Sequence, residues 1–463
     1  TGACLAEGTV GMMAMTLSRA AGILGAESID GGVDFNGLST DTRKMPSGSL
    51  FVALQGENFD GHDFLQQASD CGAAAAAVSR PVEAPLPVLR VKDTRLALGQ
   101  LAAHWRSGFS LPLVGVTGSN GKTTVKEMVA SILSRRGETL VTRGNLNNDI
   151  GLPLTLSRLG AEHRYAVIEM GANHPGEIAY LTQVARPTIA LVTNAGPAHL
   201  EGFGDLRGVA RAKGEIFSGL DEEGVAVINA DDAFADLWRD LAGPRRIIDF
   251  GLCDRAAVRA QWRGEVTGSR LHLYTPQGEI ELRLGLPGQH NVVNALAACA
   301  ASLAAGASLE DIRTGLESLD PVRGRLNIYH PADGVTVIDD TYNANPNSLQ
   351  AALDVLAMTG GEKWLVLGDM GELGPRARQL HQQVAAQAEG AGVSRVYGLG
   401  ELARETVTAF GKKAQWYESM DDMLHGLQSD LGAGVSVLVK GSRLMKMERA
   451  VFALCGRSGE GDH

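Results

Sequence analysis

The sequence predicts an α/β protein of three domains, and three observations lead to this prediction. The chain has 463 residues, which is too long for one typical hydrophobic core. Apolar content is ordinary at 44%, and 58 glycines indicate many tight turns. Apolar runs of strand length alternate with helical patterns along most of the chain. We expect a small mixed α/β domain over 16–107, a central parallel-sheet domain over 108–320 and a Rossmann-like domain over 321–463.

Charge and cysteine content exclude several classes of protein. A net charge of −11 disfavours a nucleic-acid partner, so phosphates must be bound by local donors. The five cysteines are scattered, odd in number and free of C-x-x-C spacing, which indicates reduced thiols in a cytoplasmic protein. No apolar run approaches the roughly 20 residues that cross a bilayer, so we expect no membrane span.

The stretch VGVTGSNGKTT, residues 114–124, predicts a phosphate-binding loop, or P-loop, between a strand and a helix. Glycines let backbone N–H groups turn inward, the lysine reaches phosphate oxygens and the first threonine hydroxyl can bind Mg²⁺. Val116 stands where the strict pattern has its first glycine, and a simple glycine turn is the alternative interpretation. The predicted binding residues are Gly118, Ser119, Asn120, Gly121, Lys122, Thr123 and Thr124.

Polar residues follow the strands predicted after this loop. The strand at 165–169 ends in Glu169, and the strand at 189–193 leads into Asn194 and then His199. In a parallel sheet the ligand site lies beyond the carboxyl ends of the strands, so Glu169 and His199 could both reach Mg²⁺. A hydrogen-bonded loop histidine is the alternative for His199.

A lysine interrupts the apolar face of the helix predicted over 209–220. Lys213 falls among Val209, Ile216 and Phe217 at helical spacing. A buried ammonium without a partner is costly, so this lysine has a function or a carboxylate neighbour, unless its side chain extends to solvent.

Polar clusters mark two further candidate sites. Asn291 and Asn294 are three residues apart on one helical face, where an amide can bind an adenine edge, with helix capping as the alternative for Asn291. Near the N-terminus, Ser39, Thr40 and Arg43 could hold a phosphate or a uracil edge, or could form a solvated turn before an edge strand.

The α/β pattern restarts beyond residue 325. Strands are predicted over 335–340, 363–367, 394–399 and 435–439, and three of them end in polar or glycine turns. Arg325 and Asp340 stand at the start of this domain, where they would face a cleft if the domains close on a nucleotide.

Motifs along the chain resemble those of the Mur ligase family. They are TGSNGKTT, NLNNDIG, IEMGANHPGEI, NAGPAHLEGFG, ARAKGEIF, GQHNVVNALAA, DDTYNANPNS, GDMGELG and VKGSR. The resemblance covers nearly the whole chain from Thr16 onward. It is closest to the members that add D-alanyl-D-alanine to UDP-N-acetylmuramoyl-tripeptide.

The resemblance assigns roles to these residues. Residues 118–124 would bind ATP phosphates, Thr123 and Glu169 would hold one Mg²⁺, and His199 would join a second Mg²⁺ site. Lys213 would be carbamylated, which turns a buried cation into a metal-binding anion. The catalytic set would be Lys122, Glu169, His199 and Lys213. The resemblance implies adenine binding at Asn294, nucleotide closure by Arg325 and Asp340, UDP binding at Ser39, Thr40 and Arg43, and sugar-peptide contacts at Asn147 and Asn148.

The implied reaction is an ATP-dependent peptide ligation in the cytoplasm by a monomer. A carboxylate is a poor acyl donor, so it first takes the γ-phosphoryl group of ATP, and positioning and charge neutralisation assist that step. The amine of the dipeptide then attacks, a tetrahedral intermediate forms and phosphate leaves.

Other functions predict other features. A sister ligase that adds the third residue would carry a DNPR-type signature, which the chain lacks. Folylpolyglutamate synthetase has no UDP-sugar domain like residues 39–64. An ATP-binding switch protein gives no reason for Glu169, His199 and Lys213 to converge, and a phosphotransferase would leave a stable phosphorylated product.

Overall fold

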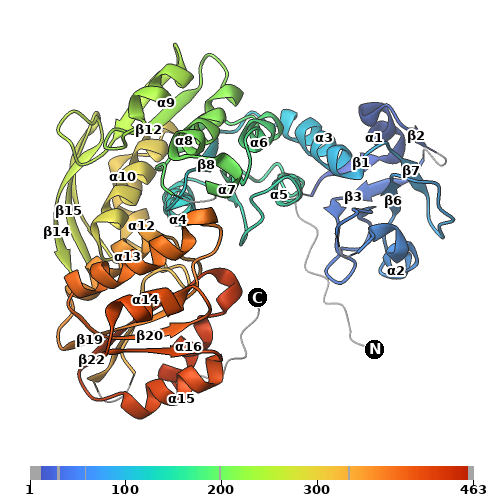
Figure 1. Ribbon diagram of the computed structural model, residues 1–463. Helices are drawn as coiled ribbons and strands as arrows, with labels where there is room; N and C mark the ends of the chain where they lie inside the picture. Colours follow the sequence, from blue (N-terminus) through green and yellow to red (C-terminus); the bar gives the residue numbers. More distant parts are fainter. Residues whose placement is uncertain (1–11, 29–31, 58, 198–199, 332–333, 457–463) are drawn as a thin grey trace.

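A computed structural model describes residues 12–28, 32–57, 59–197, 200–331 and 334–456. The chain forms three groups of elements that follow one another in sequence (Figure 1). The mixed α/β architecture with parallel sheets confirms the predicted fold class. No helix in these ranges is long and apolar enough to cross a membrane.

The N-terminal group is a small sheet with helices around it. Its five-stranded sheet has the order β2-β7-β6-β5-β4, and β1 and β3 form a separate antiparallel pair. The strands are β1 (Ala14–Thr16), β2 (Glu27–Ser28), β3 (Asp34–Asn36), β4 (Leu38–Ser39), β5 (Leu50–Val52), β6 (Ala75–Val78) and β7 (Val88–Arg90). The helices include α1 (Leu17–Leu24), α2 (Leu65–Asp70) and α3 (Thr94–Ser107).

The central group is built on a six-stranded parallel sheet of order β13-β12-β11-β8-β10-β9. Its strands are β8 (Leu113–Thr117), β9 (Thr139–Val141), β10 (Tyr165–Glu169), β11 (Ile189–Val192), β12 (Val225–Asn229) and β13 (Arg246–Phe250). Both faces are covered, as the apolar strands predicted. Val114 and Val116 pack under α4 (Lys122–Leu133), α10 (Gln289–Ala304) and α11 (Leu309–Glu317). The opposite core includes α5 (Gly151–Leu156), α6 (Glu177–Ala185), α8 (Leu206–Gly214) and α9 (Ala235–Ala242).

Two features of the central group differ from the sequence prediction. The first is an antiparallel sheet of β14 (Arg259–Glu265), β15 (Gly268–Thr275) and β16 (Gly278–Leu284), which interrupts the βα alternation. Leu271, Leu273, Leu282 and Leu284 point into the same core as α10, so the pattern of period two was the available signal.

The second difference is that the helix predicted over 209–220 ends early. Helix α8 stops at Gly214, and Glu215–Gly219 form a 3₁₀ turn. The hydroxyl of Thr182 donates to the carbonyl of Ile216 at 3.1 Å, which turns that carbonyl toward α6. The Glu215 carboxylate accepts the N–H groups of Gly176 and Ala179 at the start of α6, so tertiary contacts override the helical pattern.

The C-terminal group is a six-stranded sheet of order β17-β18-β22-β19-β20-β21. Only β17 runs antiparallel to its neighbour among these paired strands. The strands are β17 (Asn327–Tyr329), β18 (Thr336–Asp340), β19 (Glu362–Gly368), β20 (Val393–Leu399), β21 (Ala414–Tyr417) and β22 (Val435–Lys440). One core holds α12 (Pro346–Ala357) and α13 (Ala377–Gly390), with α14 (Ala403–Phe410) beside it. The other holds α15 (Met420–Asp430) and α16 (Glu448–Leu454).

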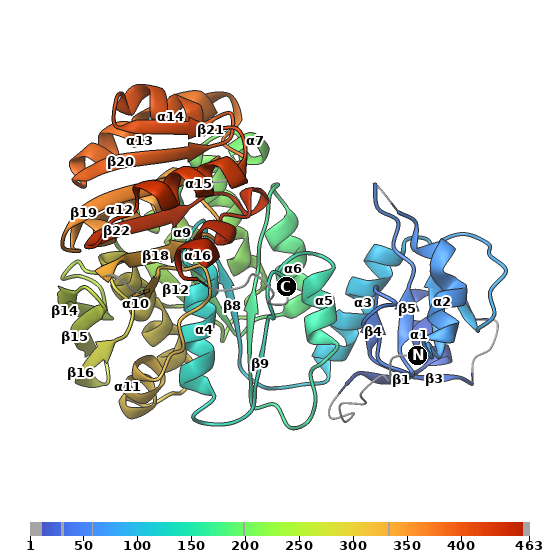
Figure 2. The same ribbon diagram turned by 90° about the horizontal axis from the view of Figure 1, so that it is seen from below.

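Helix α3 joins the N-terminal group to the central one. Its residues Leu98 and Leu101 pack in the N-terminal core, while Ala102 packs in the central core. The buried guanidinium of Arg106 donates to the carbonyls of Ala185 and Arg186 at the end of α6. Figures 1 and 2 show the N-terminal group standing to one side, connected near α3 and α5, and the C-terminal group against the central one.

Candidate functional site

The P-loop leaves β8 and enters α4 through two glycines with positive φ. Gly118 has φ 144° and Gly121 has φ 82°. A Cβ at Gly118 would overlap the hydroxyl of Thr193, and one at Gly121 would overlap the side-chain oxygen of Asn294. The first helical hydrogen bond runs from Val125 N–H to Gly121 C=O at 2.8 Å. The N–H groups of the first helical turn therefore have no partner inside the helix and are available to an anion.

The segment after β11 fixes this loop from one side. The N–H of Asn120 donates to the side-chain oxygen of Asn194 at 3.0 Å, and the Asn194 amide donates back to the Asn120 carbonyl at 3.1 Å. The N–H of Gly196 donates to the Ser119 hydroxyl at 2.9 Å. The loop is therefore held in shape before any ligand binds.

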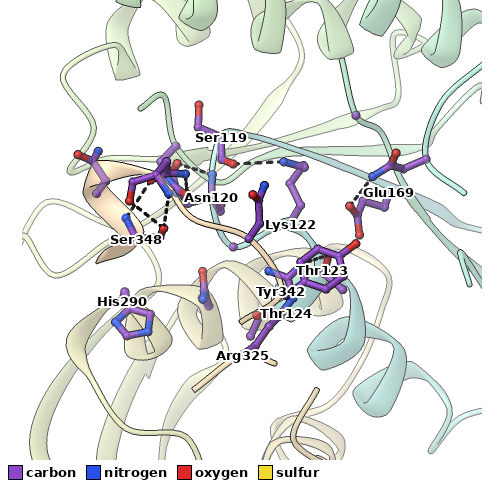
Figure 3. Close-up of a pocket in the computed structure, with 18 of the residues that line it drawn as sticks. Ser119, Asn120, Lys122, Thr123, Thr124, Glu169, His290, Arg325, Tyr342 and Ser348 are labelled. Carbon is purple, nitrogen blue, oxygen red and sulfur yellow. Dashed lines mark hydrogen bonds between the residues drawn. The ribbon is translucent and has the colours of Figure 1, made fainter. Parts of the chain in front are cut away.

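The ammonium of Lys122 folds back over its own loop. It donates to the carbonyl of Gly118 at 2.8 Å and to that of Ser119 at 3.2 Å. Figure 3 shows the bond to Ser119. Burial lowers the pKa of Lys122 and Arg325 lowers it further, while Glu169 acts in the opposite direction. A phosphate group in the loop would compensate the cost of burying this cation.

Glu169 presents a buried carboxylate at the end of β10. Its side chain is 2% exposed, and Oε1 accepts the Asn147 amide at 2.8 Å. Oε2 has no hydrogen-bond partner among the residues that the structure describes. A buried carboxylate oxygen without a donor is costly, which makes this oxygen suited to a metal ion.

Lys126 and Thr142, which were not predicted from the sequence, hold the backbone of Glu169 in place. The buried ammonium of Lys126 donates to the carbonyl of Thr142 at 2.8 Å. The Thr142 hydroxyl accepts the backbone N–H of Glu169 at 3.0 Å. Lys126 lies one helical turn after Lys122, so its spacing on α4 was visible, but its contact with the strand end was not.

Lys213 is fully inside the molecule, which rules out the alternative that its side chain extends to solvent. It is 2% exposed, donates to the Ala172 carbonyl at 3.3 Å and lies 5.2 Å from the ring centre of Phe203. Burial lowers its pKa to about 7, with a smaller effect of Lys122, while Glu177 and Glu215 oppose the shift.

The second predicted metal ligand, His199, lies outside the described residues. Within the described ranges no group of three or more His, Cys, Asp or Glu side chains is placed to hold a metal ion.

Residues of the C-terminal group reach the P-loop directly. The Arg325 guanidinium donates to the Thr123 hydroxyl at 2.9 Å and lies 4.2 Å from the ring centre of Tyr342 (Figure 3). The Asn345 amide donates to the side-chain oxygen of Asn120 at 2.7 Å. Tyr342 and Asn345 belong to the DDTYNANPNS motif but were not singled out from the sequence.

Asp340 is paired within its own group. Its carboxylate meets the ammonium of Lys440, a buried residue that sequence reasoning also missed. Lys440 also donates to the carbonyl of Asn343 at 2.9 Å. Nearby, burial lowers the pKa of His290 to about 4, so this imidazole is neutral at physiological pH.

A cavity of about 1600 Å³ lies between the central and C-terminal groups and contains most of the predicted site. The predicted residues that line it are Ser119, Asn120, Gly121, Lys122, Thr123, Thr124, Asn147, Asn148, Glu169, Asn294, Arg325 and Asp340. Asn294 donates to the Asn291 side chain at 3.2 Å, as their shared helical face predicted. Asn291 is inside α10, whose cap is Gly288, so Asn291 is not the helix cap.

The predicted residues of the N-terminal group do not line this cavity. The hydroxyl of Ser39 donates to the Asp41 carbonyl at 3.2 Å. Arg43 makes a bidentate pair with the Asp41 carboxylate at 2.9 and 2.8 Å, which lowers the pKa of Asp41. Ser39 ends β4, the edge strand of its sheet, so a separate surface carries Ser39, Thr40 and Arg43.

Comparison with known proteins identifies the family. Three models match: "Mur ligase family, catalytic domain" over 34–106, "Mur ligase middle domain" over 116–302 and "Mur ligase, glutamate ligase domain" over 324–443. A relative from Escherichia coli, "UDP-N-acetylmuramoyl-tripeptide--D-alanyl-D-alanine ligase", is 46% identical over 96% of this chain and 99% of its own. The chain belongs to the Mur ligase family.

Solved structures of Mur ligases agree with this assignment. A UDP-N-acetylmuramoylalanyl-D-glutamyl-2,6-diaminopimelate--D-alanyl-D-alanyl ligase from Acinetobacter baumannii is 38% identical, with a TM-score of 0.87 over 97% of this chain and all of that one. A MurF ligase from Thermotoga maritima in complex with ADP is 28% identical, with a TM-score of 0.81 over 91% of this chain and 97% of its own.

Gly121→Ala tests whether the tight packing of the P-loop against Asn294 controls nucleotide binding. The new Cβ would displace Asn294, and we expect ADP affinity to fall by at least about tenfold, ~1.4 kcal/mol. Gly306→Ala is the matched control, because Gly306 has a similar φ of 90° with open space around it. Isothermal titration calorimetry measures both, and unchanged ADP affinity in Gly121→Ala would contradict this role of the loop.

Proposed function

We propose that this chain joins D-alanyl-D-alanine to UDP-N-acetylmuramoyl-tripeptide, with ATP converted to ADP and phosphate. The observation that carries the proposal is the meeting of a P-loop, a buried carboxylate and a C-terminal arginine around one cavity. The near full-length relative with this activity in its name supports the choice of acceptor.

The tripeptide nucleotide enters the reaction through its terminal carboxylate. A carboxylate oxygen attacks the γ-phosphorus of ATP, the bond to the β-phosphate oxygen breaks, and an acyl phosphate and ADP result. The amine of D-alanyl-D-alanine then adds to the acyl carbon. The tetrahedral intermediate collapses, phosphate leaves and a peptide bond remains.

The P-loop and Lys122 neutralise charge in the first step. The free N–H groups at the start of α4 face the phosphates, and Lys122 exchanges its two carbonyl partners for phosphate oxygens. Arg325 reaches the same place from the C-terminal group, so a nucleotide there would draw both groups together. Asn294 lies against the loop at Gly121, and it binds the adenine in this proposal.

Mg²⁺ fits the chemistry of Glu169 and Thr123. Glu169 offers a buried oxygen without a donor, and the Thr123 hydroxyl lies in the first turn of α4. The ion would screen phosphate charge during transfer. We propose that a second Mg²⁺ site includes His199 and a carbamylated Lys213. Only a neutral amine combines with CO₂, and a pKa of about 7 makes the neutral form of Lys213 available at physiological pH.

The remaining assignments divide the work among the three domains. Residues 16–107 bind the UDP-sugar through Ser39, Thr40 and Arg43, and residues 108–320 bind ATP, with Asn147 and Asn148 contacting the sugar-peptide. Residues 321–463 close on the nucleotide through Arg325 and Asp340 and bind the dipeptide. The enzyme acts as a monomer in the cytoplasm, where ATP and UDP-linked precursors are found.

Phosphate release tests this function. Purified protein is incubated with ATP, Mg²⁺ and UDP-N-acetylmuramoyl-tripeptide, with and without D-alanyl-D-alanine, and products are identified by mass. We expect phosphate only when both substrates are present, together with the pentapeptide nucleotide. Release with a single amino acid would reassign the protein to a sister ligase, and release without either substrate would refute ligation.

Lys213→Ala tests the carbamate. We expect turnover to be nearly abolished, because the metal-binding anion is lost, and we expect added short carboxylic acids to restore part of it. Lys412→Ala, at an exposed lysine of the C-terminal group, is the control and keeps full turnover. Full activity of Lys213→Ala in the phosphate assay would refute a bridging carbamate.

A further inference from the structure

An ion pair between α3 and the segment before α5 lines the cavity where the N-terminal group joins the central one. Arg95, in the first turn of α3, meets Asp149, which precedes α5, with 3.3 Å between Nη1 and Oδ2. Both residues line the cavity, and their side chains are 53% and 34% exposed. The pair therefore faces the space that a substrate would fill, and it bridges the N-terminal and central groups.

Both partners stand on fixed backbone. The Asp93 carboxylate accepts the N–H groups of Arg95 and Leu96 at 2.8 and 3.0 Å, which caps α3. The Asn148 side chain accepts the N–H of Gly151 at 2.9 Å, which fixes the turn that carries Asp149. The cap of α3 and the Asn148 turn before α5 therefore hold the backbone on both sides of the ion pair.

The proposed reaction places the reacting end of the peptide beside Glu169, which is near this pair. Asn147 donates to Glu169, and Asp149 is two residues farther on, at most about 7 Å along the chain. The carboxylate that reacts must approach the P-loop beside Glu169. The side chain of the same amino acid can therefore extend past Asn147 toward Asp149 and Arg95.

We propose that Arg95 and Asp149 select the third residue of the peptide substrate, and that they favour a side chain ending in both an ammonium and a carboxylate. This inference rests on the proposed function. A 2,6-diaminopimelate residue has such an end, separated from its reacting centre by four carbon–carbon bonds, which span roughly 5 Å in an extended zigzag. The Acinetobacter relative carries diaminopimelate in its name.

Exchange of ionic partners explains the preference. An exposed ion pair contributes little by itself, so a ligand can open it at small cost. A lysine ammonium that binds Asp149 leaves Arg95 without an anion. A zwitterionic end gives Asp149 an ammonium and gives Arg95 a carboxylate, to which the guanidinium donates two N–H groups. Selection therefore comes from the arginine, whereas both side chains can use the aspartate.

Steady-state kinetics with two substrates tests this proposal. UDP-N-acetylmuramoyl-tripeptides ending in diaminopimelate or in lysine are compared in wild type, Arg95→Gln and Asp149→Asn. We expect wild type to favour the diaminopimelate substrate at least about tenfold in kcat/KM, mainly through KM. Arg95→Gln raises KM for that substrate alone and removes the preference. Asp149→Asn raises KM for both substrates.

Controls separate selection from a structural role. Arg90→Gln, at an exposed arginine of β7, leaves both KM values unchanged. KM for ATP and for D-alanyl-D-alanine stays constant in every variant. Equal loss on both substrates in Arg95→Gln, or a wild type without preference, would overturn the inference alone. Absence of ligation with both substrates in wild type would overturn the proposed function and this inference with it.

Discussion

The P-loop packs tightly between the end of β11 and the start of α10, and the rest of the site depends on this packing. Gly118 and Gly121 have no room for a Cβ, because Thr193 and Asn294 occupy the adjacent space. This packing brings the end of a neighbouring strand and the start of a later helix to the same loop. The side-chain oxygen of Asn194 accepts the N–H of Asn120, so the loop keeps its shape without using the first N–H groups of α4. Those N–H groups stay open to a ligand.

The C-terminal group completes the site through a small number of polar contacts. Arg325 and Asn345 reach Thr123 and Asn120 across chain separations of more than 200 residues. The neutral Asn345–Asn120 bond contributes about 1 kcal/mol and the bond from the charged Arg325 about 1.5–3 kcal/mol, so a ligand that bridges the same groups can replace them. The contact therefore places the two groups for reaction without locking them together.

The sequence predicted what depends on local pattern, and it missed what depends on distant contacts. The strands around β8 and β18, the P-loop and the burial of Lys213 follow from periodicity and glycine placement. The sheet β14–β16 has its own period-two signal, but the predicted βα alternation did not include it. Lys126, Lys440 and Asn345 act on residues that folding brings to them, and nothing in their local sequence shows those partners. The 3₁₀ turn after Gly214 arises in the same way from Thr182 and Glu215.

The central claim is that the cavity activates a carboxylate by transferring a phosphoryl group to it. The most direct test uses UDP-N-acetylmuramoyl-tripeptide with ¹⁸O in both oxygens of its terminal carboxylate, with ATP, Mg²⁺ and D-alanyl-D-alanine. Mass spectrometry of the released phosphate should find one ¹⁸O atom, and the new amide should keep the other. Release of unlabelled phosphate would show that no carboxylate oxygen had been joined to phosphorus. No acyl phosphate would then have formed, which would contradict this account.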